Sequence, residues 1–238
     1  MQLPTSLKFL LLPIVLFSTA TTGFTLLVPF NEEFATGTSN WLAGDSSAAT
    51  WNATGGVDGG GYISAPGTIV SSGFGAIVFR GNATADASGG AFVGDWLTGG
   101  VTLFNTYVRH NALADLNIFA RLDSGAGRAG STVSFLVAPN TWTLLSVPIE
   151  DSASSFQSYG GASPGGQVPN AAGFSSIFSN ILNIQIVVAP DGELAGDTYS
   201  FDVDGVSVVP EPGTVGLLVF GLAGLAWLQR RRTRRKLA

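Results

Sequence analysis

The sequence predicts an all-β fold, a β-sandwich of jelly-roll type. Three observations predict it: short β-branched and aromatic runs recur about every ten residues, turn residues separate them, and helical periodicity occurs only once. The 238 residues include 32 glycines and 11 prolines, which is typical of a folded, turn-rich chain. The chain has no cysteine, so an apolar core without disulfides must hold the fold together.

Most of the expected strands lie in the second half of the chain. In the clearest one, Leu116, Ile118 and Leu122 share one face, and Asn117 and Arg121 share the other. Similar runs predict the remaining strands at 101–108, 131–137, 142–149, 184–188 and 198–209. Pro148 lacks an amide hydrogen, so the strand at 142–149 is expected at a sheet edge.

Two local features interrupt this strand pattern. In the last expected strand, the inward face changes phase at Asp204-Gly205, which predicts a β-bulge of one extra residue. A short amphipathic helix is expected where apolar residues recur at helical spacing, at Phe174, Ile177, Phe178 and Ile181. The sequence contains neither an internal repeat nor a second domain.

The N-terminus predicts export. Lys8 precedes an apolar run at 9–17, and the small residues Ser18-Thr19-Ala20 follow it. Residues 1–20 are therefore expected to be a signal peptide that signal peptidase removes after Ala20. The alternative is an N-terminal anchor that stays uncleaved.

The C-terminus contains an uncharged segment at 213–228, followed by Arg230, Arg231 and Arg232 and three more basic residues. Sixteen helical residues span roughly 24 Å, so this segment crosses only a thin or locally pinched membrane. The basic cluster stays in the cytoplasm, which places the preceding chain outside. The alternative is a buried core helix.

These two ends resemble the PEP-CTERM proteins of Gram-negative bacteria that make exopolysaccharide. The resemblance rests on Val209-Pro210-Glu211-Pro212, the short apolar segment and the cluster Arg230-Arg231-Arg232. It implies that 210–238 is a sorting signal, recognised and removed by an exosortase-type enzyme. The precursor is then held transiently in the inner membrane, and the ectodomain 21–209 reaches the cell surface or the extracellular matrix.

The expected ectodomain is acidic. Residues 21–209 contain four arginines and no lysine against fifteen carboxylates, a formal charge of −11. Nucleic acid is therefore not expected as a partner. Exopolysaccharide is the expected partner, although an anionic polysaccharide is disfavoured unless divalent cations bridge the two.

The ectodomain resembles jelly rolls of the laminin domain IV and carbohydrate-binding-module kind. The motifs are FNEEFATGTSNWLAG from Phe30, FVGDWLTGGVTLF from Phe92 and the closing strand at 198–209. The resemblance implies a structural Ca²⁺, with Glu32 or Glu33, Asp58 and Asp204 as candidate oxygen ligands. Ala35 replaces a glutamate of related openings, so one expected ligand is missing. The alternative is a solvated acidic turn.

Aromatic side chains are the candidates for binding a glycan, because their faces stack on sugar rings. A tryptophan in a sandwich also commonly fills the space between the sheets, which is the alternative for each candidate. The candidates are Trp41, Trp51, Trp96 and Trp142, with Tyr62 and Tyr159 beside them.

No catalytic site is predicted. His110 is the single histidine and is expected to be a solvated turn residue, and the adjacent Glu150 and Asp151 are expected to form a polar cap. The expected function is that of an exported, non-catalytic protein of the cell envelope or exopolysaccharide matrix, with a glycan-binding or adhesive role. The alternative is a secreted glycan-active enzyme with two catalytic carboxylates.

Overall fold

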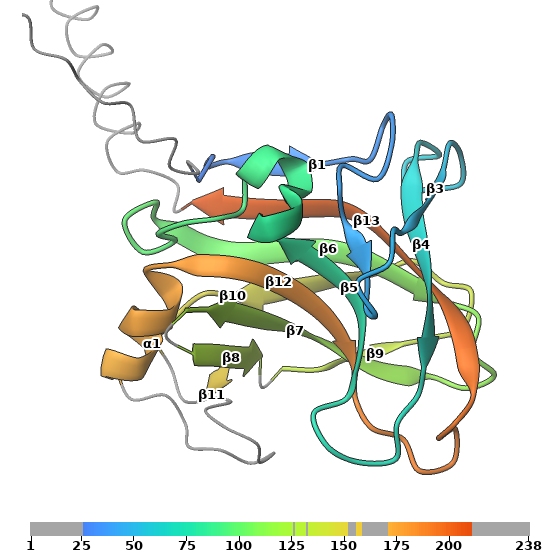
Figure 1. Cartoon of the computed structure of the whole chain (residues 1–238). Helices are drawn as coiled ribbons and strands as arrows, with labels where there is room; N and C mark the ends of the chain where they lie inside the picture. The colour runs from blue at the N-terminus through green and yellow to red at the C-terminus, as the bar shows by residue number, and fades with distance from the viewer. Residues whose placement is uncertain (1–25, 126, 132, 152–155, 159–170, 211–238) are drawn as a thin grey trace, which may run out of the picture.

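The computed structural model describes residues 26–125, 127–131, 133–151, 156–158 and 171–210 (Figure 1). These residues form two antiparallel sheets, one α-helix and two short 3₁₀ segments. The strands are β1 Phe30–Glu32, β2 Leu42–Ala43, β3 Thr50–Asn52, β4 Tyr62–Thr68, β5 Ala76–Asn82, β6 Val101–His110, β7 Leu116–Ser124, β8 Gly127–Ser131, β9 Phe135–Val137, β10 Thr143–Pro148, β11 Phe156–Ser158, β12 Ile181–Val188 and β13 Thr198–Pro210. The helices are η1 Ala83–Ala85, η2 Ala87–Gly90 and α1 Ala171–Phe178.

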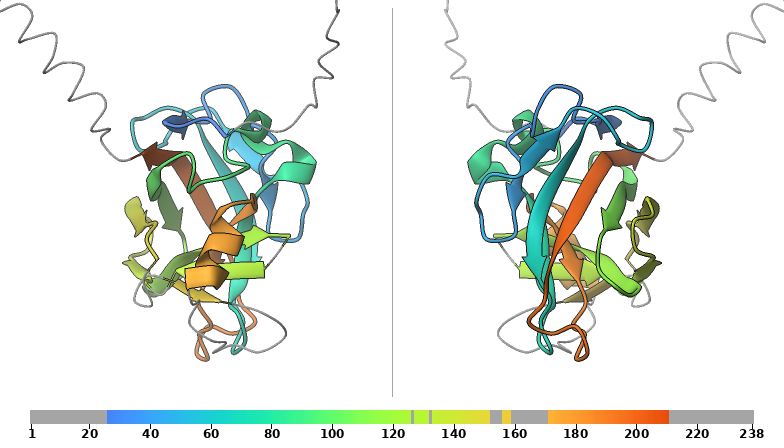
Figure 2. Two further views of the ribbon diagram at one scale, coloured as in Figure 1. Left: turned by 90° about the vertical axis from the view of Figure 1, so that its left-hand side faces the viewer. Right: turned by 90° about the vertical axis from the view of Figure 1, so that its right-hand side faces the viewer.

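One sheet, called sheet A here, has the strand order β10-β6-β13-β4-β3 in the described part of the chain. β1 also belongs to it, because β1 pairs with the second half of β13, where Phe30 lies opposite Val208. The first and last strands of the domain therefore lie side by side at one end of the sandwich (Figure 2).

The second sheet, sheet B, has the order β11-β8-β7-β12-β5-β2, and β9 pairs with the other end of β7. The long strands alternate between the two sheets along the chain, since β5 lies in sheet B, β6 in sheet A, β7 in sheet B and β10 in sheet A. Two antiparallel sheets connected in this way confirm the predicted β-sandwich of jelly-roll type.

The core lies between the inward faces of the two sheets. Phe104 and Val108 of β6 and Ile186 of β12 are fully buried in it. Trp96 stacks on Phe104 with ring centres 6.2 Å apart. Such contacts replace the disulfides that the chain does not contain.

Three local predictions are confirmed. α1 begins at Ala171 and covers most of the segment with helical periodicity. The pairing of β13 with β6 shifts by one residue between Asp204 and Ser207, which is the predicted bulge. Pro148 lies in β10, at the edge of sheet A.

The prediction of one continuous strand at 131–137 is wrong. β8 and β9 both pair with β7, where Arg121 lies opposite Gly130 and Ile118 lies opposite Phe135. Between these two pairs β7 advances by three residues, whereas the segment opposite it advances by five. The hydrogen-bond ladder is therefore interrupted between β8 and β9. The predicted alternation was present, but it did not determine the register.

Among the described residues, no helix has the length and apolar character needed to cross a membrane. The predicted signal peptide 1–20 and the predicted apolar segment 213–228 lie outside the described residues.

Candidate functional site

Polar and aromatic side chains cover the outward face of sheet A. Along β6, Phe104 and Val108 point into the core, so Asn105, Tyr107 and Arg109 point away from it. Because neighbouring strands are in register, this row continues from strand to strand. Ser64 of β4, Asp202 of β13 and Arg109 of β6 are direct cross-strand neighbours.

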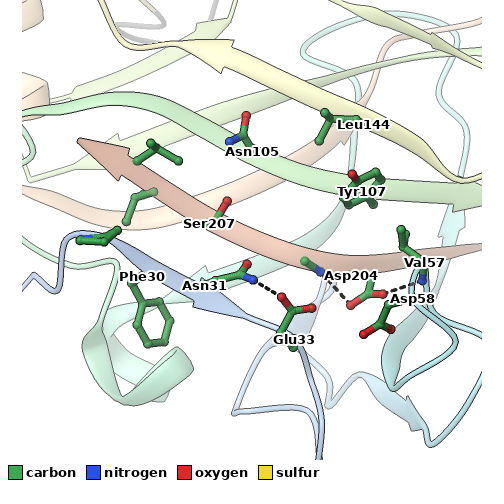
Figure 3. Close-up of a pocket in the computed structure, with 14 residues that line it drawn as sticks. Phe30, Asn31, Glu33, Val57, Asp58, Asn105, Tyr107, Leu144, Asp204 and Ser207 are labelled. Atoms are coloured by element: carbon green, nitrogen blue, oxygen red, sulfur yellow. Dashed lines mark hydrogen bonds between the residues drawn. The ribbon is translucent and has the colours of Figure 1, made fainter. Parts of the chain in front are cut away.

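A groove with a volume of 670 Å³ lies on this face, where β1, β13 and β6 run side by side (Figure 3). Tyr107 and the half-exposed Leu144 of β10 supply apolar surface. Amide, hydroxyl and carboxylate groups surround them, from Asn31, Glu33, Asp58, Asn105, Asp204 and Ser207. The groove therefore combines an aromatic ring with many hydrogen-bonding groups.

The predicted bulge positions the aromatic ring of the groove. Gly205 has a φ of 56°, a left-handed conformation that glycine adopts without steric cost. A Cβ atom on Gly205 would lie 3.2 Å from Cδ2 of Tyr107, so the tyrosine ring packs directly over the glycine. The bulge also keeps Val206 buried while Ser207 points into the groove.

The three predicted calcium ligands lie in this groove. Asp204 is 1% exposed, and its two oxygens accept hydrogen bonds from the backbone N–H groups of Val57 and Gly205. Burial raises the pKa of Asp204. The pKa of Glu33 is also raised, first by partial burial and then by the negative charges of Asp204 and Asp58.

These carboxylates do not converge on one point. Within the described residues, no group of three or more histidine, cysteine, aspartate or glutamate side chains is placed to hold a metal ion. In addition, Asn31 donates a hydrogen bond to Glu33. Glu33, Asp58 and Asp204 thus line the same groove, and calcium binding by them stays a prediction.

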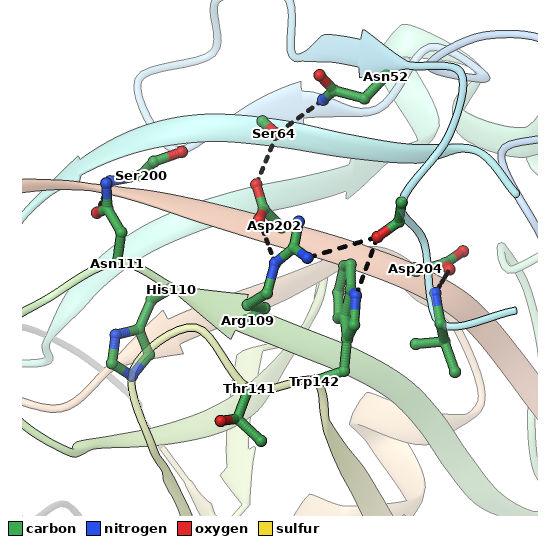
Figure 4. A network of polar contacts seen from close by, with 12 residues as sticks. Asn52, Ser64, Arg109, His110, Asn111, Thr141, Trp142, Ser200, Asp202 and Asp204 are labelled. Carbon is green, nitrogen blue, oxygen red and sulfur yellow. Dashed lines mark hydrogen bonds and ion pairs between the residues drawn. The ribbon is translucent and has the colours of Figure 1, made fainter. Parts of the chain in front are cut away.

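A polar network lies on the same face next to the groove (Figure 4). Nε of Arg109 donates to Asp202 at 2.8 Å, and the guanidinium group lies over the rings of Trp142 and Tyr62 at 4.4 and 4.9 Å. Asp202 accepts a second hydrogen bond from the hydroxyl of Ser64 at 2.6 Å. The arginine charge is therefore balanced by a carboxylate and packed against two aromatic rings, which contact each other edge to face.

The loop between β3 and β4 crosses the outward face at this network. The carbonyl of Gly55 accepts hydrogen bonds from Trp142 Nε1 at 3.1 Å and from Arg109 Nη1 at 3.4 Å. A second hollow of 380 Å³ is lined by Arg109, Asn111 and Asp202, among others. The loop thus lies between this hollow and the larger groove, and it contributes Val57 and Asp58 to the groove.

The structure divides the four predicted tryptophans into two groups. Trp41 and Trp96 are 0% exposed, so the prediction that they stack on a glycan is wrong. Both fill the core, where the Nε1 of Trp41 donates to Ser88 and that of Trp96 to the Phe92 carbonyl. Trp51 is 38% exposed, and Trp142 is half-buried beside Arg109. Tyr159 lies outside the described residues.

His110 is a core residue, so its expected place in a solvated turn is wrong. It is 1% exposed at the end of β6. Nδ1 accepts a hydrogen bond from the Ala112 N–H, so Nε2 carries the proton and donates to the Val137 carbonyl at 2.8 Å. Burial lowers the pKa of His110. The single histidine of the chain is therefore a neutral structural residue.

At the end of β13, Val208, Val209 and Pro210 run directly into Glu211-Pro212, the apolar segment and the basic cluster. Residues 208–232 are a PEP-CTERM protein-sorting motif. The PEP-CTERM motif indicates an exported, surface-sorted protein that an exosortase processes. Val209 and Pro210 are the predicted sorting residues within β13, and Glu211, Pro212, Arg230, Arg231 and Arg232 lie outside the described residues.

Several solved structures are similar to this chain at low identity. A Clostridium thermocellum xylanase with a family 22 carbohydrate-binding module is 12% identical with a TM-score of 0.45, over 76% of this chain and 28% of that one. The family 11 carbohydrate-binding module of Clostridium thermocellum, in complex with a mixed-linked tetrasaccharide, is 14% identical with a TM-score of 0.45, over 77% and 97%. The L4b domain of human laminin alpha-2 is 10% identical with a TM-score of 0.38, over 67% and 96%. No curated protein sequence matches the chain.

Besides the predicted carboxylates, the groove contains residues that the sequence did not single out, among them Asn31, Asn105, Tyr107 and Ser207. The signal for two of them was present, because Asn105 and Tyr107, like Arg109 of the neighbouring network, alternate with apolar residues in the run VTLFNTYVRH. An exposed strand face with an amide, an aromatic ring and a guanidinium group is a candidate binding surface. Asn31 and Ser207 had no such signal, since only the pairing of β1 with β13 brings them to this groove.

Proposed function

We propose that the domain is a non-catalytic, polysaccharide-binding protein of the cell surface or exopolysaccharide matrix of a Gram-negative bacterium. Its binding surface is the groove on the outward face of sheet A. The PEP-CTERM motif supports export and sorting to the surface. The composition of the groove supports the ligand class, and it is the observation that carries this proposal.

A sugar ring presents hydroxyl groups at its edge and apolar C–H groups on its faces. The groove offers the matching chemistry, because Tyr107 and Leu144 supply apolar surface between amide and hydroxyl groups of Asn31, Asn105 and Ser207. An amide both donates and accepts hydrogen bonds, which suits the hydroxyl groups of a sugar. The groove lies along the strands of sheet A, so it is suited to a segment of a polymer.

The charge of the groove favours a neutral polysaccharide. Glu33 and Asp58 line the groove, and the whole segment 21–209 carries a formal charge of −11. Arg109 lies on the same face, but its ion pair with Asp202 balances its charge. A polyuronate or a sulfated polymer would meet electrostatic repulsion here.

Affinity electrophoresis of the purified full chain tests the proposal, with the host exopolysaccharide, xylan, mixed-linkage β-glucan and polygalacturonate in the gels. We expect retardation by the host polymer or a neutral glucan or xylan, and little by polygalacturonate. Tyr107→Ala is expected to weaken retention roughly tenfold. A nucleic acid base stacked on an aromatic ring contributes about 1–3 kcal/mol, and we expect a sugar ring on Tyr107 to gain an amount at the lower end of this range. Tyr199→Ala is the matched control. Like Tyr107, Tyr199 of β13 is half-buried, but it lies outside the groove. Retention that Tyr107→Ala leaves unchanged would contradict the proposal.

The alternative function is a glycan-active enzyme. The raised pKa of Glu33 in a groove with a second carboxylate, Asp58, is the observation that favours it. Asp204 is poorly suited to catalysis, because it is buried and both of its oxygens accept backbone hydrogen bonds. Reducing-end assays with the same polysaccharides decide between the two functions: we expect no release of new reducing ends. Release that Glu33→Gln abolishes would establish the enzyme.

A further inference from the structure

The sorting motif and the folded sandwich share three residues. The motif begins at Val208, whereas β13 continues to Pro210. Val208 is 0% exposed and lies opposite Phe104 of β6 on one side and Phe30 of β1 on the other. The first residue of the motif is therefore part of the core and has strand partners on both of its edges.

The next two residues are held by β6. The carbonyl of Val209 accepts a hydrogen bond from the hydroxyl of Thr102 at 3.3 Å, and Pro210 lies opposite Val101. A processing enzyme binds its substrate as an extended segment and commonly pairs with the backbone of that segment. β6 pairs with β13 as far as Pro210, and β1 pairs with it from Val206 to Val208. The enzyme therefore reaches this segment only if β13 first separates from the sheet.

We propose that the folded sandwich sets the upstream limit of processing: the chain is cut after Pro210, and the mature protein keeps β13 complete. This inference concerns the sorting motif and is independent of the proposed polysaccharide binding. It also gives the fold a role in sorting. While β13 is unpaired, the bonds around Val208 are open to cleavage, so the length of the product reports whether the domain had folded.

Limited proteolysis of the full chain in detergent tests this limit. Subtilisin, a protease of broad specificity, is added under native conditions, and intact mass gives the new C-terminus. We expect a stable product that ends at or after Pro210, with no cleavage between Val206 and Val209. The same chain in urea is the reference, and there we expect cleavage at these bonds. A native product that ends before Pro210 would overturn the proposal.

Two variants test whether strand pairing is the cause. Phe30→Ala removes the ring that packs on Phe92, with ring centres 5.1 Å apart, and so loosens β1 from β13. Cleavage upstream of Val208 is expected to become roughly tenfold faster, since proteolysis follows the population of the open state. Thr102→Val removes the hydroxyl that donates to Val209 and keeps the side-chain shape, so a smaller increase is expected.

Thr68→Val is the matched control, because Thr68 is an exposed residue of β4 that lies opposite Thr198, at the other end of β13. It is expected to leave the C-terminal product unchanged. If Phe30→Ala fails to fold, Thr102→Val and the wild-type comparison with urea still decide the question. The mature protein recovered from its host provides an independent measurement: an intact mass that corresponds to a C-terminus before Pro210 would contradict the inference.

Discussion

The guanidinium carbon of Arg109 lies 4.4 Å from the centre of the Trp142 ring, and both side chains donate hydrogen bonds to the carbonyl of Gly55. This relationship connects β6, the residue directly before β10 and the loop between β3 and β4 across the outward face of sheet A. Because Arg109 also pairs with Asp202 of β13 and packs on Tyr62 of β4, a single side chain contacts four separate parts of the domain.

Arg109→Met is expected to destabilise the domain by about 1–3 kcal/mol, since a partly buried carboxylate, Asp202, loses its charged partner. Urea unfolding measures the change. Arg109→Lys keeps the charge but loses the planar guanidinium group that stacks on the aromatic rings, so an intermediate loss of stability is expected. A midpoint for Arg109→Met equal to that of the wild type would show that the network does not contribute to stability.

The two groups of tryptophans predict different effects on stability. Trp41→Ala is expected to destabilise the domain by about 3–5 kcal/mol, because it empties a fully buried site. Trp51→Ala is expected to cost about 1 kcal/mol, mainly through the lost hydrogen bond from Nε1 to the Phe34 carbonyl. Thermal and urea unfolding of the two variants check this. Equal destabilisation would contradict the division into core and surface residues.

Gly205→Ala is expected to destabilise the domain by about 1–2 kcal/mol, because alanine resists a φ of 56° and its Cβ approaches the Tyr107 ring. Gly37→Ala is the control, since no atom lies within 4 Å of a Cβ placed there. We expect that control to change the free energy of unfolding by less than about 0.5 kcal/mol. A neutral Gly205→Ala would show that the bulge tolerates other residues.

His110 predicts the pH dependence of stability near neutrality. Burial lowers its pKa below the value of 6.5, so the unfolded chain binds a proton more readily than the folded one. The stability that this neutral histidine provides is complete above pH 6.5, and it decreases as the pH falls below that value. Because the chain has one histidine, its imidazole signals in an NMR titration are unambiguous. The imidazole of the folded protein is expected to titrate with a pKa below 6.5, and titration at the unfolded value would contradict this.

The calcium prediction requires that added Ca²⁺ raises the melting temperature, since an ion that binds only the folded state stabilises it. A cation near Glu33 and Asp58 would also relieve the repulsion that raises the pKa of Glu33. Millimolar Ca²⁺ is therefore expected to raise the midpoint relative to EDTA, and the double variant Glu33→Gln/Asp58→Asn is expected to remove the difference. Equal midpoints for the wild type in Ca²⁺ and EDTA would show that the calcium prediction is wrong.

The sequence predicted the strands in which apolar and polar residues alternate, but it missed β4. Pro66 and Gly67 disfavour a strand in isolation, yet both fit the structure. β3 pairs only with residues 62–64 of β4. The missing backbone N–H of Pro66 therefore interrupts no pairing with β3. A Cβ on Gly67 would lie 2.6 Å from Val78 Cγ1, so close packing between the sheets favours glycine here. Tertiary contacts therefore determine that Pro66 and Gly67 belong to a strand.

The candidate site was predicted less completely than the fold. A tryptophan ring can either stack on a sugar or fill space in a core. Trp41 and Trp96 lie in segments without alternating polar and apolar residues, so the sequence does not show which of their faces is buried. The groove depends on pairing across the whole domain, since Asn31, Asn105 and Ser207 come from three strands. Glu33, Asp58 and Asp204 were singled out because the resemblance to known jelly rolls implies a site between the first and last strands.

β13 lies in the interior of sheet A, and its last three residues belong to the sorting motif. A pull on that end of the domain acts along the strand, so the hydrogen bonds to β6 on one side and to β4 and β1 on the other are loaded in shear and resist together. An edge strand pulled in the same way has a ladder on one side only. We therefore expect this end of the domain to resist extension more strongly than an edge strand would.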